Sequence, residues 1–219
     1  YSFTREAQDA FAIASVQRAK AATESGAFAA EITPVTVKTR AGDTVISIDE
    51  GPGKVKLDKI PTLKPAFKKD GTITAASSSS INDGAAALVM MKESTANRYG
   101  LTPLARVVGH SMHAQEPGWF TTAPVGATQK LLAKTGWKTS DVDLWEVNEA
   151  FAVVPMALME ELKISHDIVN VNGGACALGH PIGASGARIM VTLLHALKAR
   201  GGKRGVATLC IGGGEATAM

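Results

Sequence analysis

The sequence predicts an α/β protein in which helices cover a largely buried sheet. Two observations carry this prediction. From about residue 85 onward, short apolar runs that are typical of buried strands alternate with segments of helical periodicity, and the connections are short. Glycine is frequent where these runs end, and residues 171–219 hold 11 of the 22 glycines. We therefore place a domain boundary near residue 83, between residues 1–82 and an α/β domain over residues 83–219.

The composition fits an ordinary globular chain and excludes several classes of protein. Of the 219 residues, 45% are hydrophobic and 20% are charged, which suits a chain that buries a core. The net charge of +3 is too small to indicate a nucleic-acid surface, and no apolar run approaches the ~18–20 residues of a membrane span. Two cysteines, Cys176 and Cys210, exclude a disulfide scaffold and fit a reducing compartment. We expect a soluble, cytoplasmic protein that binds neither membranes nor nucleic acids.

The first predicted element is a helix over residues 4–25. Thr4 is a suitable N-cap, and Glu6 and Asp9 lie in the early turns, where carboxylates interact favourably with the helix dipole. Gly26 follows as a stop signal.

A hairpin is predicted next. Residues 34–38 and 44–48 alternate between apolar and polar side chains, and residues 41–43 supply the turn between them. Residues 49–72 contain several glycines and prolines and few packing residues, so this stretch is predicted to be irregular. The serine run at residues 77–80 is predicted to be a loop.

The α/β domain contributes the remaining elements. Strands are predicted over residues 85–91, 105–113, 144–147, 169–171 and 206–211, and helices over residues 94–99, 124–135, 148–162 and 185–200. The glycines Gly100 and Gly201 follow two of these helices, as is typical of helix ends. The chain opens at Tyr1 rather than at a methionine and stops at Met219, directly after a strand and a glycine turn. We therefore expect it to be part of a longer polypeptide.

The glycine-rich turns do not match the known nucleotide-binding patterns. Gly179, Gly183 and Gly186 have the wrong spacing for the dinucleotide fingerprint, and the helix that follows carries no acidic residue. A phosphate-binding loop with its lysine is also absent from the sequence. The sequence therefore predicts no nicotinamide cofactor.

Three reactive side chains lie where strands meet helices or glycine turns. Asn148 follows a strand and opens a predicted helix, His180 lies between glycine and proline, and Cys210 ends a strand before three glycines. Open α/β sheets place their chemistry at such ends. Each residue also has a structural interpretation: Asn148 as a helix cap, His180 as a buried hydrogen-bonding histidine and Cys210 as an inert core thiol.

Together these segments resemble the thiolase family. The sequences NEAF at residues 148–151, GHPIGASG at 179–186 and CIGGG at 210–214 are similar to the three C-terminal signatures of that family. SSINDGAAA at residues 79–87 resembles the segment that enters its C-terminal domain, and WEVN at 145–148 is similar to the biosynthetic acetyl-CoA acetyltransferases in particular. The motifs follow the family's order and spacing along essentially the whole chain.

The resemblance implies a layered αβαβα architecture, of which this chain supplies the C-terminal half and part of the loop domain. Residues 1–82 would belong to the loop domain that covers the substrate, and residues 83–219 would form the C-terminal domain. In thiolases a cysteine of the N-terminal half carries the acyl group. Neither Cys176 nor Cys210 occupies that motif, so the resemblance implies that the nucleophile lies in an N-terminal half outside this sequence.

The implied reaction is the reversible Claisen condensation of two acetyl-CoA molecules to acetoacetyl-CoA and CoA, through an acyl-cysteine intermediate. His180 would take the proton of the nucleophilic cysteine, and Cys210 would remove and return the α-proton of acetyl-CoA. Asn148 would hold a water that, with His180, donates to the thioester oxygen, and the Gly212 backbone N–H would serve the other oxyanion pocket. Coenzyme A thioesters would be substrates, so no cofactor is implied.

The resemblance also implies contacts to the coenzyme A arm. Ser79 would form a hydrogen bond with pantetheine, and Phe67, Ile81 and Phe151 would line the channel. Phe120, in a segment where many thiolases have methionine and glycine, would shape the acyl pocket. For each phenylalanine the alternative is an ordinary place in the core.

A metal site and two other classes of protein are the alternatives to this reaction. His110 and His113 are three apart on a predicted strand and therefore on opposite faces, so no metal site is expected. A non-catalytic acyl-CoA-binding or lipid-binding protein on the same scaffold needs no nucleophile and remains the alternative. A decarboxylating ketoacyl synthase would require histidine in place of Cys210.

The resemblance further implies a homodimer or homotetramer, completed by the N-terminal half of the same polypeptide.

Overall fold

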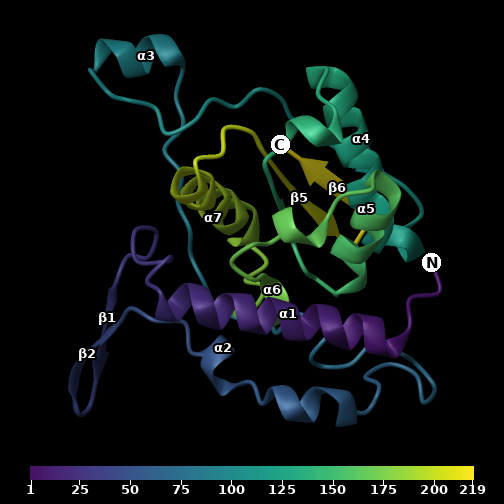
Figure 1. Cartoon of the computed structure of the whole chain (residues 1–219). Helices are drawn as coiled ribbons and strands as arrows, with labels where there is room; N and C mark the ends of the chain where they lie inside the picture. The colour runs from purple at the N-terminus through teal and green to yellow at the C-terminus, as the bar shows by residue number, and fades with distance from the viewer.

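The computed structural model describes residues 1–219 and confirms the α/β class. Its centre is a four-stranded mixed sheet with the order β3–β6–β5–β4. Figure 1 labels two of its strands, β5 and β6. The strands are β3 (Ser111–Ala114), β4 (Leu144–Val147), β5 (Gly205–Ile211) and β6 (Glu215–Ala218). β4 and β5 are parallel, whereas β6 runs antiparallel to both β5 and β3.

Helices cover both faces of this sheet. α4 (Ala123–Thr135) and α5 (Val153–Leu162) pack on one face, and α7 (Ser185–Arg200) packs on the other. Trp145 points toward α4 and α5, whereas its neighbour Leu144 points toward α7. This alternation is the period of two that a strand imposes on its side chains, and it places apolar residues of β4 in both layers.

The N-terminal part is built on the long helix α1 (Arg5–Glu24), which passes beneath the sheet domain (Figure 1). The predicted cap is confirmed, because the Thr4 side chain accepts a hydrogen bond from the Ala7 N–H at 3.1 Å. The predicted hairpin is also confirmed as β1 (Val35–Thr39) and β2 (Gly42–Ile46). It extends away from the sheet domain with both strands exposed.

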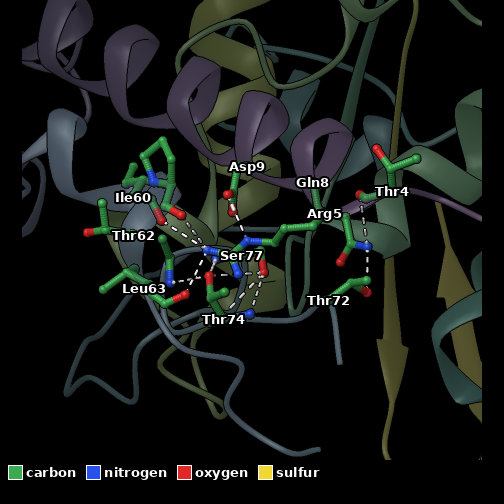
Figure 2. A network of polar contacts seen from close by, with 12 residues as sticks. Thr4, Arg5, Gln8, Asp9, Ile60, Thr62, Leu63, Thr72, Thr74 and Ser77 are labelled. Carbon is green, nitrogen blue, oxygen red and sulfur yellow. Dashed lines mark hydrogen bonds and ion pairs between the residues drawn. The ribbon is translucent and has the colours of Figure 1, made fainter. Parts of the chain in front are cut away.

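A polar clamp joins α1 to the irregular segment that follows the hairpin (Figure 2). The Arg5 guanidinium pairs with Asp9 at 2.7 Å and donates to the carbonyl oxygens of Ile60 and Leu63 at 3.1 and 2.9 Å. The Gln8 amide donates to the Thr72 hydroxyl at 2.9 Å. These bonds hold residues 57–77 against α1, and this segment leads directly into the serine run.

Short helices complete the fold. They are α2 (Gly51–Lys54), α3 (Glu93–Arg98), α6 (Ala175–Leu178), and the 3₁₀ helices at Leu57–Thr62, Pro117–Thr122, Thr139–Asp141 and His166–Ile168. The predicted helix over residues 94–99 is confirmed as α3, which stands away from the rest of the molecule (Figure 1). None of the helices has the length and apolar character needed to cross a membrane.

The predicted strand over residues 85–91 is wrong. The segment is irregular, and Val89 and Met90 are 89% and 64% exposed. A strand requires a neighbour for its backbone N–H and C=O groups, and no strand of this chain pairs with these residues. The predicted strand over residues 105–113 shrinks for the same reason to β3, which starts at Ser111, where β6 supplies a partner.

Two further predictions need correction around β4. The predicted helix over residues 148–162 begins only at Val153, because Ser79 N–H donates to Ala150 O and Ala152 N–H donates to Ser77 O. The predicted strand over residues 169–171 is reduced to a single bridge between Val169 and Trp145. The strand β6 was not predicted at all, although the glycine turn before it is a hairpin signal.

Candidate active site

Asn148 and His180 meet at the end of β4. The Asn148 Nδ2 atom lies 3.3 Å from His180 Nε2. Asn148 continues the sheet by one residue, since its backbone N–H donates to Thr208 O at 3.0 Å. The backbone N–H of His180 donates to Ser80 O at 2.9 Å, which ties its loop to the serine run. Two predicted site residues that are 32 positions apart are therefore in contact.

The other ring nitrogen of His180 is also held. His180 Nδ1 lies 2.5 Å from Ser185 Oγ, and the Ser185 hydroxyl donates to Pro181 O at 3.0 Å. Burial, and to a lesser degree the positive charge of Arg188, lowers the pKa of His180. The imidazole is therefore neutral near pH 7 and able to accept a proton.

Glu149 anchors the loop that carries Asn148. Its side chain is fully buried and accepts hydrogen bonds from the Ser15 hydroxyl at 2.7 Å, the Asn170 amide at 2.8 Å and the Cys176 backbone N–H at 3.0 Å. These donors come from α1, from the segment between the His166–Ile168 helix and α6, and from α6 itself. A single carboxylate therefore fixes three segments around the site, and its buried oxygens are satisfied.

The fit around this carboxylate requires a glycine. A Cβ atom added at Gly174 would overlap the carboxyl group of Glu149. Gly174 precedes α6, which leads into the His180 loop, so this close approach sets the distance between the Glu149 loop and the His180 loop.

A groove of about 280 Å³ opens beside His180. It is lined by Phe67, Ser78, Ser79, Ser80, Ile81, Ala150, Phe151, His180 and Ile182. Five predicted site residues lie in this set: Phe67, Ser79, Ile81, Phe151 and His180. Its floor consists of the serine run and the loop after β4, and its rim is apolar.

The predicted channel residues differ in their environments. Phe67 and Ile81 are 69% and 94% exposed, so the core interpretation of Phe67 does not hold. The Phe151 ring packs edge-on against Phe67 and Phe120, with ring centroids 5.9 and 6.3 Å apart. Phe120 does not line the groove itself, but it contacts Phe151, which does. The Ser79 hydroxyl donates to Ala150 O at 3.1 Å, which leaves its oxygen to accept a hydrogen bond from a ligand.

Cys210 and Gly212 lie on the neighbouring strand and its turn. Cys210 is buried near the end of β5, pairs with Ala216 of β6 and faces α4 and α5. Gly212 is exposed in the turn between β5 and β6. Neither residue forms a hydrogen bond with Asn148 or His180.

Burial keeps both cysteines protonated. It raises the pKa of Cys210 to about 11. The pKa of Cys176 is also raised, by burial and by the neighbouring charge of Glu149. Cys210 is therefore a thiol at neutral pH, ready to donate a proton, whereas its use as a base requires the proton to leave first.

Sequence reasoning did not assign a role to Ser185 or Glu149. Both belong to the matched motifs, but their partners, Pro181 and Ser15 among them, become visible only when the chain is folded. The structure contains no group of three or more His, Cys, Asp or Glu side chains that could hold a metal ion. His113 instead lies within 3.1 Å of Gln115.

Two family models match the chain. The thiolase C-terminal domain matches residues 101–219, and the thiolase N-terminal domain matches residues 1–94. The boundary that we place near residue 83 remains a prediction.

Curated relatives and solved structures agree with these matches. The chain is 52% identical to an acetyl-CoA acetyltransferase of Thiocystis violacea and 54% identical to one of Escherichia coli, with all of the chain and 56% of each relative covered. The acetyl-CoA acetyltransferase of Bacillus anthracis superposes with a TM-score of 0.97 at 47% identity. The Acat5 thiolase of Ascaris suum, solved in complex with coenzyme A, superposes with a TM-score of 0.89 at 45% identity. Both structures cover 100% of this chain and are themselves covered to 56%.

The chain belongs to the thiolase family. The relatives that it matches are acetyl-CoA acetyltransferases, and the chain spans little more than half of their length. It is a partial thiolase that contains the Asn148, His180 and Cys210 motifs.

Proposed function

We propose that the polypeptide carrying this chain is an acetyl-CoA acetyltransferase that condenses two acetyl-CoA molecules to acetoacetyl-CoA and CoA, and also runs the reverse thiolysis. The observation that carries this proposal is the contact between Asn148 and His180 at the wall of an apolar groove. This pair can present hydrogen-bond donors to a thioester oxygen, where negative charge develops as the enolate forms.

His180 takes the proton of the acyl-carrying cysteine in the first half of the reaction. Its lowered pKa supports this role, because only the neutral ring accepts a proton. In the second half His180 and a water held by Asn148 donate to the thioester oxygen. The Asn148 Oδ1 atom is buried without a hydrogen-bond partner in the chain, and such an atom is suited to accept a hydrogen bond from a water.

Cys210 is the acid and base of the second half. In thiolysis the Cys210 thiol donates its proton to the departing acetyl-CoA enolate, and in condensation the thiolate removes an α-proton. The pKa of about 11 supports the thiol as the resting form, which is the state that thiolysis needs. The Gly212 backbone N–H is proposed to stabilise the oxyanion beside the nucleophile, since its turn is exposed at the end of β5.

The groove is proposed to receive the pantetheine arm. Phe67, Ile81 and Phe151 provide apolar contacts, and the Ser79 oxygen accepts from an amide N–H of the arm. Phe120 packs against the Phe151 ring and so influences the end of the groove that receives the acyl group. Coenzyme A thioesters are substrates in this scheme, and the proposal includes no cofactor and no metal.

The nucleophilic cysteine is proposed to lie in an N-terminal half of the same polypeptide, which also covers the exposed apolar run over residues 85–91. A homodimer or homotetramer is proposed from the family resemblance. The two free cysteines support a reducing compartment such as the cytoplasm.

The test is thiolysis by the full-length polypeptide. With its N-terminal cysteine intact, it should cleave acetoacetyl-CoA with free CoA to give two acetyl-CoA molecules. Binding of CoA without any turnover would instead identify a non-catalytic acyl-CoA-binding protein on this scaffold.

A further inference from the structure

Gln115 is the first residue after β3, and its backbone is held by the turn that precedes β6. Its N–H donates to Gly214 O at 3.0 Å, so the pairing of β3 with β6 extends to this residue. A Cβ atom added at Gly214 would overlap Gln115 O, so the two backbones lie as close as a glycine allows. The Gln115 side chain therefore extends from a fixed point at the end of the sheet.

The Gln115 amide uses both of its N–H groups and its oxygen within its own segment. Its Nε2 atom donates to Trp119 O at 2.5 Å and to the Thr122 hydroxyl oxygen at 2.8 Å. Because Trp119 O can only accept, the amide nitrogen lies on this side, and Oε1 accepts from His113 Nε2 at 3.1 Å. The Thr122 hydroxyl donates in turn to Trp119 O at 3.0 Å. These partners fix the orientation of the amide.

The donor to this amide, His113, is itself held in place. His113 lies on β3 opposite Ala216 of β6, and a Cβ atom added at Gly126 of α4 would overlap its imidazole ring. Gly126 lies inside the helix, where glycine is less favourable than alanine. The missing side chain leaves the space that the ring occupies, so the imidazole is confined between β3 and α4.

The two groups that the Gln115 amide binds flank Phe120 in the sequence. Trp119 directly precedes Phe120, and Thr122 follows it by two residues. The Phe120 ring packs edge-on against the Phe151 ring, with centroids 6.3 Å apart. Phe151 lines the groove beside the candidate site, whereas Gln115 does not. The Gln115 amide therefore acts on the groove only through the position of the Phe120 ring.

We propose that Gln115 is a positioning residue for substrate specificity, because its amide holds Phe120 against Phe151 and the two rings limit the groove to short acyl groups. The inference rests on the proposed function, since the acyl group is the substrate of that reaction. It concerns the length of the acyl chain and not the chemical steps. Without the amide, the segment that carries Phe120 can shift and leave room for a longer chain.

The kinetic test compares thiolysis of acetoacetyl-CoA and of 3-ketohexanoyl-CoA by the full-length polypeptide. Gln115→Met keeps the length of the side chain but forms none of these hydrogen bonds. It should raise kcat/KM for 3-ketohexanoyl-CoA relative to acetoacetyl-CoA about 10-fold, which is the scale on which an apolar pocket discriminates chain length. The kcat for acetoacetyl-CoA should stay nearly unchanged. Gln129→Met, at an exposed glutamine of α4, is the matched control and should leave the ratio unchanged.

A double variant distinguishes an effect on Phe120 from a general loosening of the segment. Phe120→Ala should raise the same ratio, and Gln115→Met added to Phe120→Ala should raise it no further, because the amide acts through the ring. Thr122→Val should also raise the ratio, whereas Thr122→Ser, which keeps the hydroxyl, should not. The Thr122 pair decides the question even if Gln115→Met does not fold.

An unchanged ratio in folded Gln115→Met and in Thr122→Val would overturn the proposal, and so would independent, additive effects of Gln115→Met and Phe120→Ala. A wild-type polypeptide that cleaves neither substrate would contradict the proposed function instead. In that case the dissociation constants of hexanoyl-CoA and butanoyl-CoA, measured by calorimetry in the same variants, decide the role of Gln115. Tighter relative binding of hexanoyl-CoA by Gln115→Met would support that role, and an unchanged ratio or no binding of either compound would overturn it.

Discussion

Among the single residues of the site, His180 and Asn148 form one group and Cys210 lies apart from them. His180 and Asn148 share a hydrogen bond at the groove wall, whereas Cys210 lies on the neighbouring strand with no bond to either. This separation supports the division of roles that we propose, in which His180 and Asn148 act on the thioester oxygen and Cys210 acts on the α-carbon.

His180→Ala should lower the rates of both half reactions by about 10²–10⁴, because the imidazole activates the nucleophile and also serves the thioester oxygen. Asn148→Ala should mainly lower the second half, by roughly 10²–10³, since it removes one oxyanion donor held through water. Single-turnover acetyl transfer, compared with complete turnover, separates the two effects. Equal loss of acylation in both variants would contradict the assignment of Asn148.

The protonation state of Cys210 predicts a pH dependence. Burial raises the pKa of Cys210 to about 11, so about one thiol in a thousand is ionised at pH 8. Because the thiolate is the base, the condensation rate should rise about tenfold per pH unit between pH 7 and 9. The rate of enzyme acylation in the same buffers is the control, as Cys210 takes no part in it. A flat condensation profile would show that the thiolate is already present at pH 7.

At the scale of elements, one buried carboxylate joins α1, the loop after β4 and α6. Glu149 receives donors from Ser15, Asn170 and Cys176, and Gly174 allows the chains to approach. The arrangement is rigid because every donor and acceptor is used, so a change in one element displaces the others.

Gly174→Ala should destabilise the full-length protein by about 1–3 kcal/mol, because the new methyl group overlaps the Glu149 carboxyl group in a packed interior. Gly53→Ala is the matched control, since its Cβ would meet no atom within 4 Å. Thermal unfolding of the two variants and the wild type measures the difference. If Gly174→Ala were as stable as Gly53→Ala, the close fit at Glu149 would not hold.

Much of the fold could be predicted from the sequence where an element is specified locally. Helices α1 and α7 combine helical periodicity with glycine stops at Gly26 and Gly201, and both were predicted within a residue or two. The helix predicted from Asn148 begins later because residues 148–152 pair with the serine run. That pairing joins residues about 70 positions apart, so no local pattern contains it.

The residues of the site that belong to recognisable motifs could be predicted from the sequence, and their supporting contacts could not. Motif resemblance singled out Asn148 and His180, which the structure brings together. The supporting roles of Ser185 and Glu149 were not predictable, because they depend on hydrogen bonds between side chains and backbone groups whose positions only the fold supplies. The Ser15 bond to Glu149, across 134 positions, is the extreme case.

At the scale of the whole molecule, the chain exposes surface that an ordinary domain would bury. Val89 is 89% exposed, and Leu104, before β3, and Met112, within β3, are 76% and 66% exposed. Exposed apolar surface of this extent indicates an interaction site. We attribute it to the N-terminal half that the proposed function requires.

A protein limited to residues 1–219 should therefore show no thiolysis and should bind an apolar dye such as ANS. The full-length polypeptide should be active and bind little dye. We propose that neither thiol of the fragment carries the acyl group, since burial raises the pKa of both the half-buried Cys176 and the buried Cys210. Substantial turnover by a verified fragment would overturn the assignment of Cys210 as acid and base.

We propose that Cys210 moves the α-proton while the acyl group is carried on another cysteine. Transfer of labelled acetyl from acetyl-CoA to the enzyme, measured beside complete turnover in full-length Cys210→Ala, tests it directly. Cys176→Ala is the matched control, because it removes the other free thiol of the chain. We expect Cys210→Ala to become acetylated but to form no acetoacetyl-CoA, and Cys176→Ala to do both. Loss of acetylation in Cys210→Ala, as complete as in His180→Ala, would contradict it.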